Sequence, residues 1–370
     1  MKTGRTIAEL ALEIQRQQDS KRDYVAKTDK IDVEADRSAD FSVPDRVKLN
    51  LMASGKFAIN DLAHEQIAAH TGIPNAYYNR MKSEDPALLA NNVQAWFTRY
   101  PAPRMVRTLD NRVRAFLSDS YRPLENYDLA EAVLPTLLDN QLEIMSCEIT
   151  ERRLYIKAVD PRITRDVPTG RKMGDGSHCF FDTCSPAIII SNSEVGSGRL
   201  SVDSGVYTKV CTNMAMIAKS GMRRTHVGAK YAAVLGDGVE NIDRLLTSET
   251  RKATDRAIWL QVRDVVKGAF DEAVFTARCG ELAGMVADKI EDPVRVVELS
   301  AKKFGLSALV EKSIQRHLVE GADLTRYGLF NAVTRSAQDV ESYDAASDLE
   351  RLGGRILALG KTEWAELAVA

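Results

Sequence analysis

The chain has 370 residues, of which 44% are hydrophobic, and its 50 lysine and arginine residues nearly balance 52 aspartate and glutamate residues. A chain of this length can bury a substantial core and is expected to form about two or three subdomains. No run of about 18 uncharged apolar residues occurs, and the N-terminus lacks the apolar stretch of a secretory signal. These features exclude a typical membrane protein and predict a cytoplasmic location.

The five cysteines are scattered along the chain, and their odd number argues against a disulfide framework. One cluster, formed by His178, Cys179, Asp182 and Cys184, contains side chains that bind metals. A structural zinc site normally has a second ligand pair at similar spacing, and the sequence offers none. We therefore predict no metal and no other cofactor.

Charge is distributed unevenly along the chain. Residues 1–236 contain 32 basic and 29 acidic residues, whereas residues 237–370 contain 18 basic and 23 acidic residues. The two parts therefore carry formal charges of about +3 and −5. A negatively charged partner is expected to bind the N-terminal part.

The first 98 residues are predicted to form an arm and a helical subdomain. Residues 1–40 are polar and are expected to be mobile or peripheral, and residues 41–98 are expected to be helical. Phe57–Met81 has the spacing of a DNA-reading helix-turn-helix, although its second helix has few side chains suited to bidentate base contacts. A helical hairpin packed on the main domain is the alternative, and Val296–Leu318 has the same ambiguity.

Residues 99–236 are predicted to form a β-rich core with a basic face. Within it, two alternating runs on either side of Leu109–Asn111 predict a β-hairpin over residues 104–118. Between Arg99 and Arg122, six arginines are interleaved with Tyr100, Phe116 and Tyr121, which suits single-stranded nucleic acid because phosphates need positive charge and bases need flat faces. A half-buried hairpin with a solvated edge explains part of the same pattern. The residues expected to contact nucleic acid are Arg112, Arg114, Tyr121 and Arg122.

The next segments continue the predicted core. An amphipathic helix is expected over residues 126–140, followed by strands over residues 143–150 and 153–159. Residues 160–186 contain several prolines and glycines and are expected to form an irregular loop.

Ser185–Lys230 holds the clearest strands and the most one-sided charge. Residues 187–191 and 200–210 predict a hairpin with a glycine-containing turn at residues 194–198. Between Ser204 and Gly236 there are five lysines or arginines and no acidic residue, which indicates an anion-binding surface. Pairing with acidic helices elsewhere is the structural alternative. The residues expected to contact nucleic acid here are Asn192, Ser193, Tyr207, Lys209, Asn213, Arg223, Arg224 and His226.

The C-terminal part, residues 237–370, is predicted to be helical. Long helices are expected over residues 239–290, interrupted near Gly268 or Gly280, and Asp292–Pro293 is expected to start another helix. The fold class predicted from these segments is α+β. It consists of a mostly antiparallel sheet of about six strands with a helical layer, followed by a helical C-terminal region.

Four separated segments are together similar to a known family. RAFLSDSYRPLENYDL, ERRLYIKAVDPR, IIISNSEVGSGRLSVDSGVYTKVCTN and LFNAVTRSAQD occur in the order found in the phage- and plasmid-associated family called domain of unknown function 932. The resemblance covers roughly residues 55–345, although Met214 stands where a glycine is common in the family. It implies a mobile element that carries DNA-processing and recombination genes. The order of sheet and helices also resembles that of single-strand annealing proteins.

The favoured hypothesis is a single-stranded DNA binding or annealing protein of a phage or mobile element, acting in recombination or replication without catalysis. Single-stranded nucleic acid, with DNA favoured, and further copies of the chain are the expected partners. A protein-interaction or regulatory module is the alternative. A metal-dependent nuclease is a third hypothesis, with candidate acids Asp110, Asp119, Asp182, Glu194 and Asp203, but the sequence shows no D-x-D or E-x-K signature among them.

Overall fold

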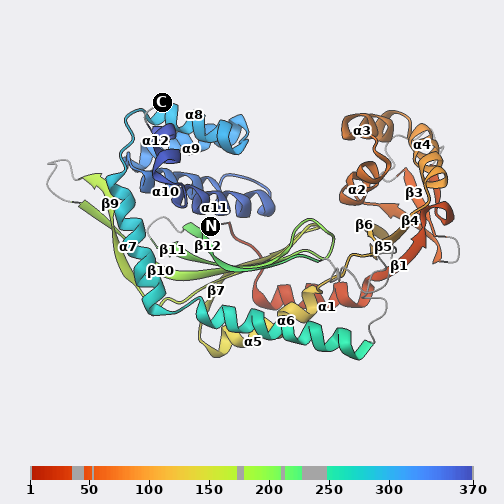
Figure 1. Ribbon diagram of the computed structural model, residues 1–370, viewed down its shortest axis with the longest axis horizontal. Coiled ribbons are helices and arrows are strands. Elements are labelled where there is room, and N and C mark those ends of the chain that lie inside the picture. Colours follow the sequence, from red (N-terminus) through yellow and green to blue (C-terminus); the bar gives the residue numbers. More distant parts are fainter. Residues whose placement is uncertain are drawn as a thin grey trace, which may run out of the picture.

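The computed structural model describes residues 2–35, 46–51, 54–172, 179–209, 213–226 and 248–368. Within these ranges the chain forms two β-sheets of six strands each, surrounded by helices (Figure 1). The predicted α+β class, with mostly antiparallel strands and a helical C-terminal region, is confirmed. The strands belong to two sheets, whereas one sheet was expected.

The first sheet has the strand order β1-β5-β6-β4-β3-β2 and lies with helices α2, α3 and α4 on the right of Figure 1. All its described pairs are antiparallel except β4 with β6. Phe57, Tyr78, Phe97 and Phe116 belong to the core that joins the helices to this sheet. The bounds are β1 Arg22–Lys27, β2 Asp32–Ala35, β3 Val47–Asn50, β4 Lys56–Ile59, β5 Pro103–Leu109, β6 Arg112–Ser118, α2 Asp61–Thr71, α3 Asn75–Glu84 and α4 Pro86–Arg99.

The predicted hairpin over residues 104–118 is confirmed as β5 and β6. Asp110 and Asn111 form its turn and both have positive φ, at 50° and 60°. A two-residue turn with this backbone matches the twist of the flanking strands, and aspartate and asparagine tolerate it. The hairpin pairs with β1 and β4, so the expected boundary between residues 98 and 99 divides a single sheet.

The described part of the predicted arm is integrated into the fold. Helix α1, Ile7–Ser20, begins with a capping box between Thr6 and Glu9, and it buries Leu10 and Ile14 in the core of the second sheet. Strand β1 then pairs with β5 along its whole length. Two buried apolar side chains and a row of backbone hydrogen bonds are therefore enough to fix a segment that is polar on average.

The second sheet is antiparallel, with the order β12-β11-β10-β8-β7 and with β9 paired to β10. The expected strands over residues 143–150 and 153–159 and the expected hairpin around residues 194–198 are confirmed. The bounds are β7 Glu143–Ile149, β8 Leu154–Val159, β9 Arg165–Lys172, β10 Cys179–Asn192, β11 Leu200–Thr208 and β12 Asn213–Arg224.

The expectation of an irregular loop over residues 160–186 is wrong for most of its length, because β9 and the first half of β10 occupy it. Pro168 lies in β9, which pairs only with β10 in the described structure, so the missing proline N–H breaks no ladder. Residues 173–178, which include His178 of the cluster that was considered and not predicted as a metal site, lie outside the described residues.

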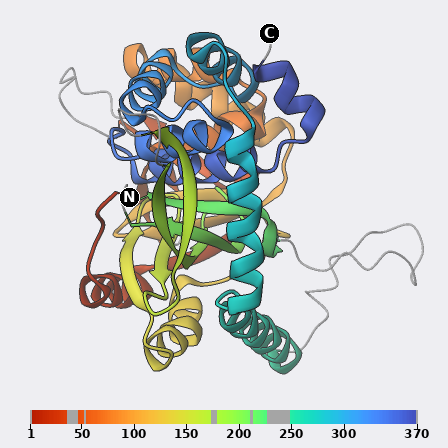
Figure 2. The same ribbon diagram turned by 90° about the vertical axis from the view of Figure 1, so that its left-hand side faces the viewer.

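The two faces of the second sheet differ in character. One face is apolar and packs on α1, on α5 (Asn126–Asp139) and on α6 (Ser248–Gly268). The other face carries polar side chains where it packs against α11, Tyr343–Leu357, and a smaller apolar cluster that includes Ala187 and Ile189. Figures 1 and 2 show the sheet between these two helical layers. We refer to the face toward α11 as the polar face.

The helical C-terminal region is confirmed, and Gly268 ends α6 as expected. Asp292 caps α8 by accepting hydrogen bonds from two backbone amides, with Pro293 at the first helical position. Both helix-turn-helix-like segments pack against the rest of the protein through one face, which buries Tyr78 and Met81 in α3 and Ile314 and Leu318 in α9, while Tyr77 and Leu309 are exposed. The remaining bounds are α7 Glu272–Gly284, α8 Pro293–Phe304, α9 Ala308–Gly321, α10 Arg326–Ser336 and α12 Lys361–Ala368, with short 3-10 helices at Thr28–Lys30 and Met285–Ala287. Among the described helices, none is long and apolar enough to cross a membrane.

Candidate functional site

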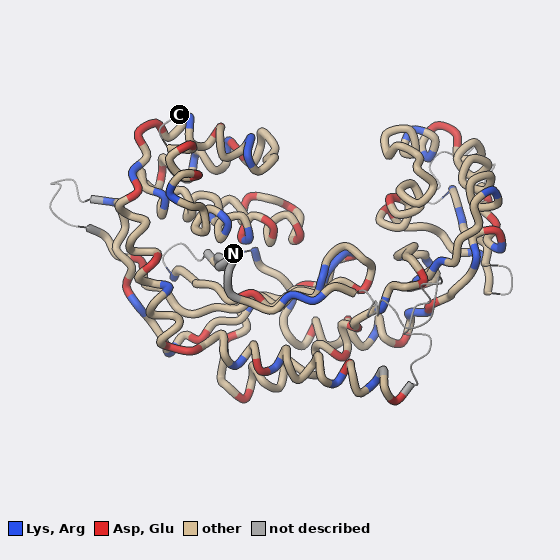
Figure 3. Tube along the Cα trace, in the orientation of Figure 1, with Lys and Arg blue, Asp and Glu red and all other residues tan. Residues whose placement is uncertain are grey.

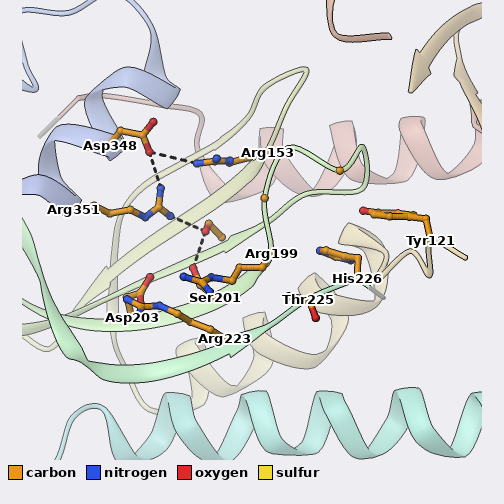
Figure 4. Close-up of a pocket in the computed structure, with 13 residues that line it drawn as sticks. Tyr121, Arg153, Arg199, Ser201, Asp203, Arg223, Thr225, His226, Asp348 and Arg351 are labelled. Atoms are coloured by element: carbon orange, nitrogen blue, oxygen red, sulfur yellow. Dashed lines mark hydrogen bonds and ion pairs between the residues drawn. The ribbon is translucent and has the colours of Figure 1, made fainter. Parts of the chain in front are cut away.

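A pocket of about 560 Å³ lies between the polar face of the second sheet and α11 (Figure 4). Its walls come from the residue before β8, the β10–β11 turn, β11, the end of β12, α11 and the segment after β6. Figure 3 shows basic positions gathered where the central strands approach α11, whereas α6 carries positions of both signs and the charged positions of α5 are all acidic. We refer to this cavity as the arginine pocket. Its charged lining residues are Arg153, Arg199, Arg223, Arg351, Asp203 and Asp348.

The alternation of the strands explains which side chains reach the pocket. Leu200 and Val202 of β11 are buried in the apolar core on α6, so Ser201 and Asp203 point to the opposite face. On β12, Met222 packs against the same apolar core. Its neighbour Arg223 therefore faces the pocket, and Arg224 points away from it.

Helix α11 closes the pocket from above the sheet. Arg351 donates a hydrogen bond from Nη2 to Ser191 Oγ at 2.8 Å and lies 3.2 Å from Asp348 Oδ1. Arg153 donates from Nη2 to the Ser197 carbonyl oxygen at 2.6 Å and approaches the same Asp348 carboxylate at 3.4 Å. The exposed carboxylate of Asp348 therefore links α11 to Arg153, whose guanidinium group is hydrogen-bonded to the β10–β11 turn.

The remaining two arginines are less restrained. Arg223 lies 3.1 Å from Asp203 Oδ1, and the Arg223 side chain keeps 41% of its exposure while Asp203 keeps 4%. Arg199 is exposed and has no hydrogen-bond or ion-pair partner among the described residues. Four guanidinium groups against two carboxylates leave the pocket with a net charge of about +2.

Tyr121 and His226 form the other end of the pocket (Figure 4). Their rings are stacked with centroids 5.4 Å apart, and the Tyr121 hydroxyl donates to the Ser193 carbonyl oxygen at 2.9 Å. His226 is 5% exposed, and burial lowers its pKa to about 4. The imidazole is therefore neutral near pH 7.

The β10–β11 turn that borders the pocket rests against the first sheet. Gly196 has φ of +77°, and a Cβ atom there would lie 2.6 Å from a methyl carbon of Leu117 on β6. The Gln66 side chain donates to the Val195 carbonyl oxygen at 2.8 Å. Glycine is favoured at this position by the positive φ and by the contact with Leu117, so the position of the turn depends on both sheets.

The structure brings three of the predicted contact residues together in the arginine pocket, namely Tyr121, Arg223 and His226. Asn192 and Ser193 lie beside it but are buried, and they donate hydrogen bonds to the Leu124 and Arg152 carbonyl oxygens. These two side chains shape the turn and are not presented to a ligand.

The other predicted contact residues lie elsewhere. Arg114 is buried against Glu194 at 2.8 Å, Arg122 binds Asp255 of α6 at 2.8 Å, and Arg112 is exposed at the start of β6. Tyr207 is buried at the opposite end of β11, which Lys209 follows, and Asn213 begins β12 at that end. The twelve candidates therefore do not form one continuous surface. They are Arg112, Arg114, Tyr121, Arg122, Asn192, Ser193, Tyr207, Lys209, Asn213, Arg223, Arg224 and His226.

Sequence reasoning missed Arg153, Arg199 and Arg351. Arg153 is the first residue of one predicted strand and Arg199 lies directly before another, where a turn-flanking basic residue is a usable signal. Arg351 lies in α11, and 160 residues of sequence separate it from Ser191, the β10 residue to which it donates a hydrogen bond. Nothing in the local pattern of α11 points to that contact.

The candidate acids of the nuclease hypothesis are engaged separately. Asp110 binds Arg16, Asp182 accepts from Tyr327, Glu194 binds Arg114 and Asp203 binds Arg223. In the part of the chain that the structure describes, no group of three or more His, Cys, Asp or Glu side chains could hold a metal ion.

Comparisons of this chain with protein-family models, with curated proteins and with solved structures found no match. The resemblance to the domain of unknown function 932 family stays a prediction from the sequence.

Proposed function

We propose that this protein binds single-stranded nucleic acid, with DNA as the favoured form, through the arginine pocket. The observation that carries the proposal is the convergence of four arginines from four segments of the chain on one pocket that also contains two stacked rings. Guanidinium groups bind phosphate oxygens in a bidentate manner, and flat rings provide faces for bases. The pocket needs no metal and no nucleophile for this role.

The biological setting of the proposal comes from the resemblance stated above. It adds a phage, plasmid or other mobile element and a role in annealing during recombination or replication. Assembly into homo-oligomers belongs to the same proposal, and a molecular mass measured with and without an oligonucleotide tests it. An interaction module without nucleic-acid affinity is the competing function.

The decisive experiment measures binding of a labelled DNA strand of about 20 nucleotides by fluorescence anisotropy, since single-strand sites span about 4–16 nucleotides. If about three phosphates are neutralised, a tenfold rise in salt weakens binding by about 100-fold. Arg199→Ala is expected to weaken binding by about tenfold, because it removes an exposed guanidinium group from the pocket.

Arg165→Ala is the matched control. Arg165 is exposed on β9, where its only described ion pair is with Glu272, and its loss changes the net charge by the same amount. Equal effects of the two substitutions would indicate nonspecific attraction to net charge. Absence of binding at low salt would reject the proposal and favour the interaction module.

A further inference from the structure

Two guanidinium groups of the arginine pocket are available to a ligand. Arg199 is exposed and has no hydrogen-bond or ion-pair partner among the described residues. Arg223 pairs with Asp203 at 3.1 Å, and its side chain keeps 41% of its exposure. A guanidinium group has five N–H donors in a fork that matches phosphate oxygens, so an anionic ligand is a natural partner for the donors that these two arginines leave unpaired.

The charge of the pocket is suited to a dianion. Arg153, Arg199, Arg223 and Arg351 exceed the two carboxylates by a net charge of about +2. A phosphomonoester carries a charge of about −1.5 to −2 at neutral pH and has three terminal oxygens. A phosphodiester inside a strand has a single charge and two such oxygens, so it matches fewer of the donors.

The size of the pocket favours a single nucleotide. Its volume of about 560 Å³ lies within the range of about 300–1,000 Å³ found for small-molecule sites. Proteins that hold the middle of a strand use a groove that spans several nucleotides. A single nucleotide, with one phosphate, its sugar and its base, matches a pocket of this size better than a stretch of several nucleotides does.

We propose that the arginine pocket binds a nucleotide phosphomonoester, which on a single strand is its terminal phosphate. Arg199 and Arg223 would contact the terminal oxygens, and Tyr121 would lie beside the base. The inference rests on the proposed function for the strand, and it adds that an end of the strand is what the pocket recognises.

The test compares strands of identical sequence that differ in one group. Two strands labelled at the 3′ end carry a 5′-phosphate or a 5′-hydroxyl, and two strands labelled at the 5′ end carry a 3′-phosphate or a 3′-hydroxyl. Binding of one phosphorylated strand is expected to be about tenfold tighter than that of its hydroxyl partner, because charge-assisted hydrogen bonds are lost with the phosphate. Thymidine monophosphate and thymidine, added as competitors, report on the free nucleotide.

Two variants connect the effect to the pocket. In Arg199→Ala the preference for the phosphorylated strand is expected to fall below about twofold, whereas Arg165→Ala keeps it. Both positions are exposed, so the thermal unfolding midpoints of the variants check that they fold as the unaltered protein does.

The outcomes separate this inference from the function proposed above. Equal affinity for phosphorylated and unphosphorylated strands overturns the inference and leaves strand binding intact. Competition by thymidine monophosphate without any strand binding supports the phosphomonoester site and overturns the strand function. A preference that survives in Arg199→Ala overturns the assignment to this pocket, and no binding of either ligand overturns both proposals.

Discussion

A lysine and a glutamate are buried together between the second sheet and α11. Lys157 Nζ of β8 lies 2.6 Å from Glu350 Oε2, and the two side chains are 0% and 1% exposed. The ammonium group also lies 4.6 Å from the centre of the Tyr343 ring. Burial lowers the pKa of Lys157, although Glu350 acts to raise it. The charged pair is therefore retained only because each partner compensates the other.

Lys157→Met is expected to lower the free energy of unfolding by about 3–5 kcal/mol, because it leaves the Glu350 carboxylate buried without a counter-charge. The double variant Lys157→Met and Glu350→Leu is expected to recover most of this loss, since similar-sized apolar pairs often replace buried ion pairs at little cost. Urea unfolding of the four forms measures the coupling. Additive losses in the double variant would show that the two charges do not depend on each other.

The buried contact between Lys157 and Glu350 could not be predicted from the sequence. The strand over Leu154–Val159 was predicted, and Lys157 is the one charged residue in it. A lysine is almost never fully buried unless it is paired, so Lys157 was expected to lie on a face that meets solvent. The separation of 193 residues between Lys157 and Glu350 leaves no local signal that a helix covers that face.

At the scale of single elements, the β5–β6 turn has a specific backbone requirement. Asp110 and Asn111 have φ of 50° and 60°. Asp110 also binds Arg16 and Ser20 of α1 through its carboxylate, so its side chain has a second role. Asn111 is exposed, which makes it the better position for testing the turn itself.

Asn111→Val is expected to destabilise the protein by about 1–2 kcal/mol, because a β-branched side chain is strained at positive φ. Asn111→Gly is the matched control and is expected to stay within about 0.5 kcal/mol of the unaltered protein, since glycine adopts this backbone freely. Thermal or urea unfolding measures both. Equal stability of the two variants would contradict a positive-φ requirement at Asn111.

Elements defined by local patterns were predictable, and those defined by distant pairing were not. Both hairpins, α5 and the Asp292 cap follow from turn residues and periodicity within short windows. Strand β9 was missed because proline and glycine outweighed its β-branched residues, and its place at the edge of the described sheet tolerates the proline. In the site, Tyr121, Arg223 and His226 were found from local runs of basic and aromatic residues, whereas the contact of Arg351 with Ser191 depends on distant pairing.

At the scale of the whole molecule, a buried ionic network joins the two sheets. Arg107 of β5 is 0% exposed, and it binds Asp23 at 2.8 Å and Glu125 at 2.7 Å. It also donates to the Glu194 carbonyl oxygen at 2.8 Å, at the turn that borders the arginine pocket. The first sheet, the start of α5 and the second sheet therefore meet at one guanidinium group. The predicted domain boundary at residue 98 lies between Asp23 and Arg107, which this network brings into contact. Sequence patterns within short windows cannot show a contact between segments so far apart.

The same junction contains two adjacent carboxyl groups with opposite pKa shifts. Burial and the neighbouring Glu194 raise the pKa of Glu125. Burial acts against ionisation of Glu194 as well, but the positive charge of Arg114 and other neighbours lowers its pKa to about 2. Glu194 therefore contributes stability that is present above pH 4.5 and is lost toward pH 2, whereas Glu125 acts in the opposite sense.

Two buried histidines add a separate dependence on pH at a higher range. Burial lowers the pKa of His64, in the helices of the first sheet, to about 3, and that of His226, in the arginine pocket, to about 4. Both folded-state values lie below the ordinary value of 6.5, so the unfolded chain binds more protons than the folded protein between pH 6.5 and 4. Stability is therefore complete above pH 6.5 and falls as the pH decreases through this window.

Each histidine is expected to contribute a slope of up to about 1.4 kcal/mol per pH unit between pH 6 and 4. His64→Gln removes one titrating group and keeps an amide that can bond the Tyr78 hydroxyl, which lies 2.9 Å from Nδ1 in the unaltered protein. Urea unfolding at pH 7, 6, 5 and 4 is expected to give a shallower dependence for this variant than for the unaltered protein, whatever its stability at pH 7. Parallel curves for the two proteins would mean that the folded protein does not lower the pKa of His64, and the acid sensitivity would then come from His226 and the junction carboxyl groups.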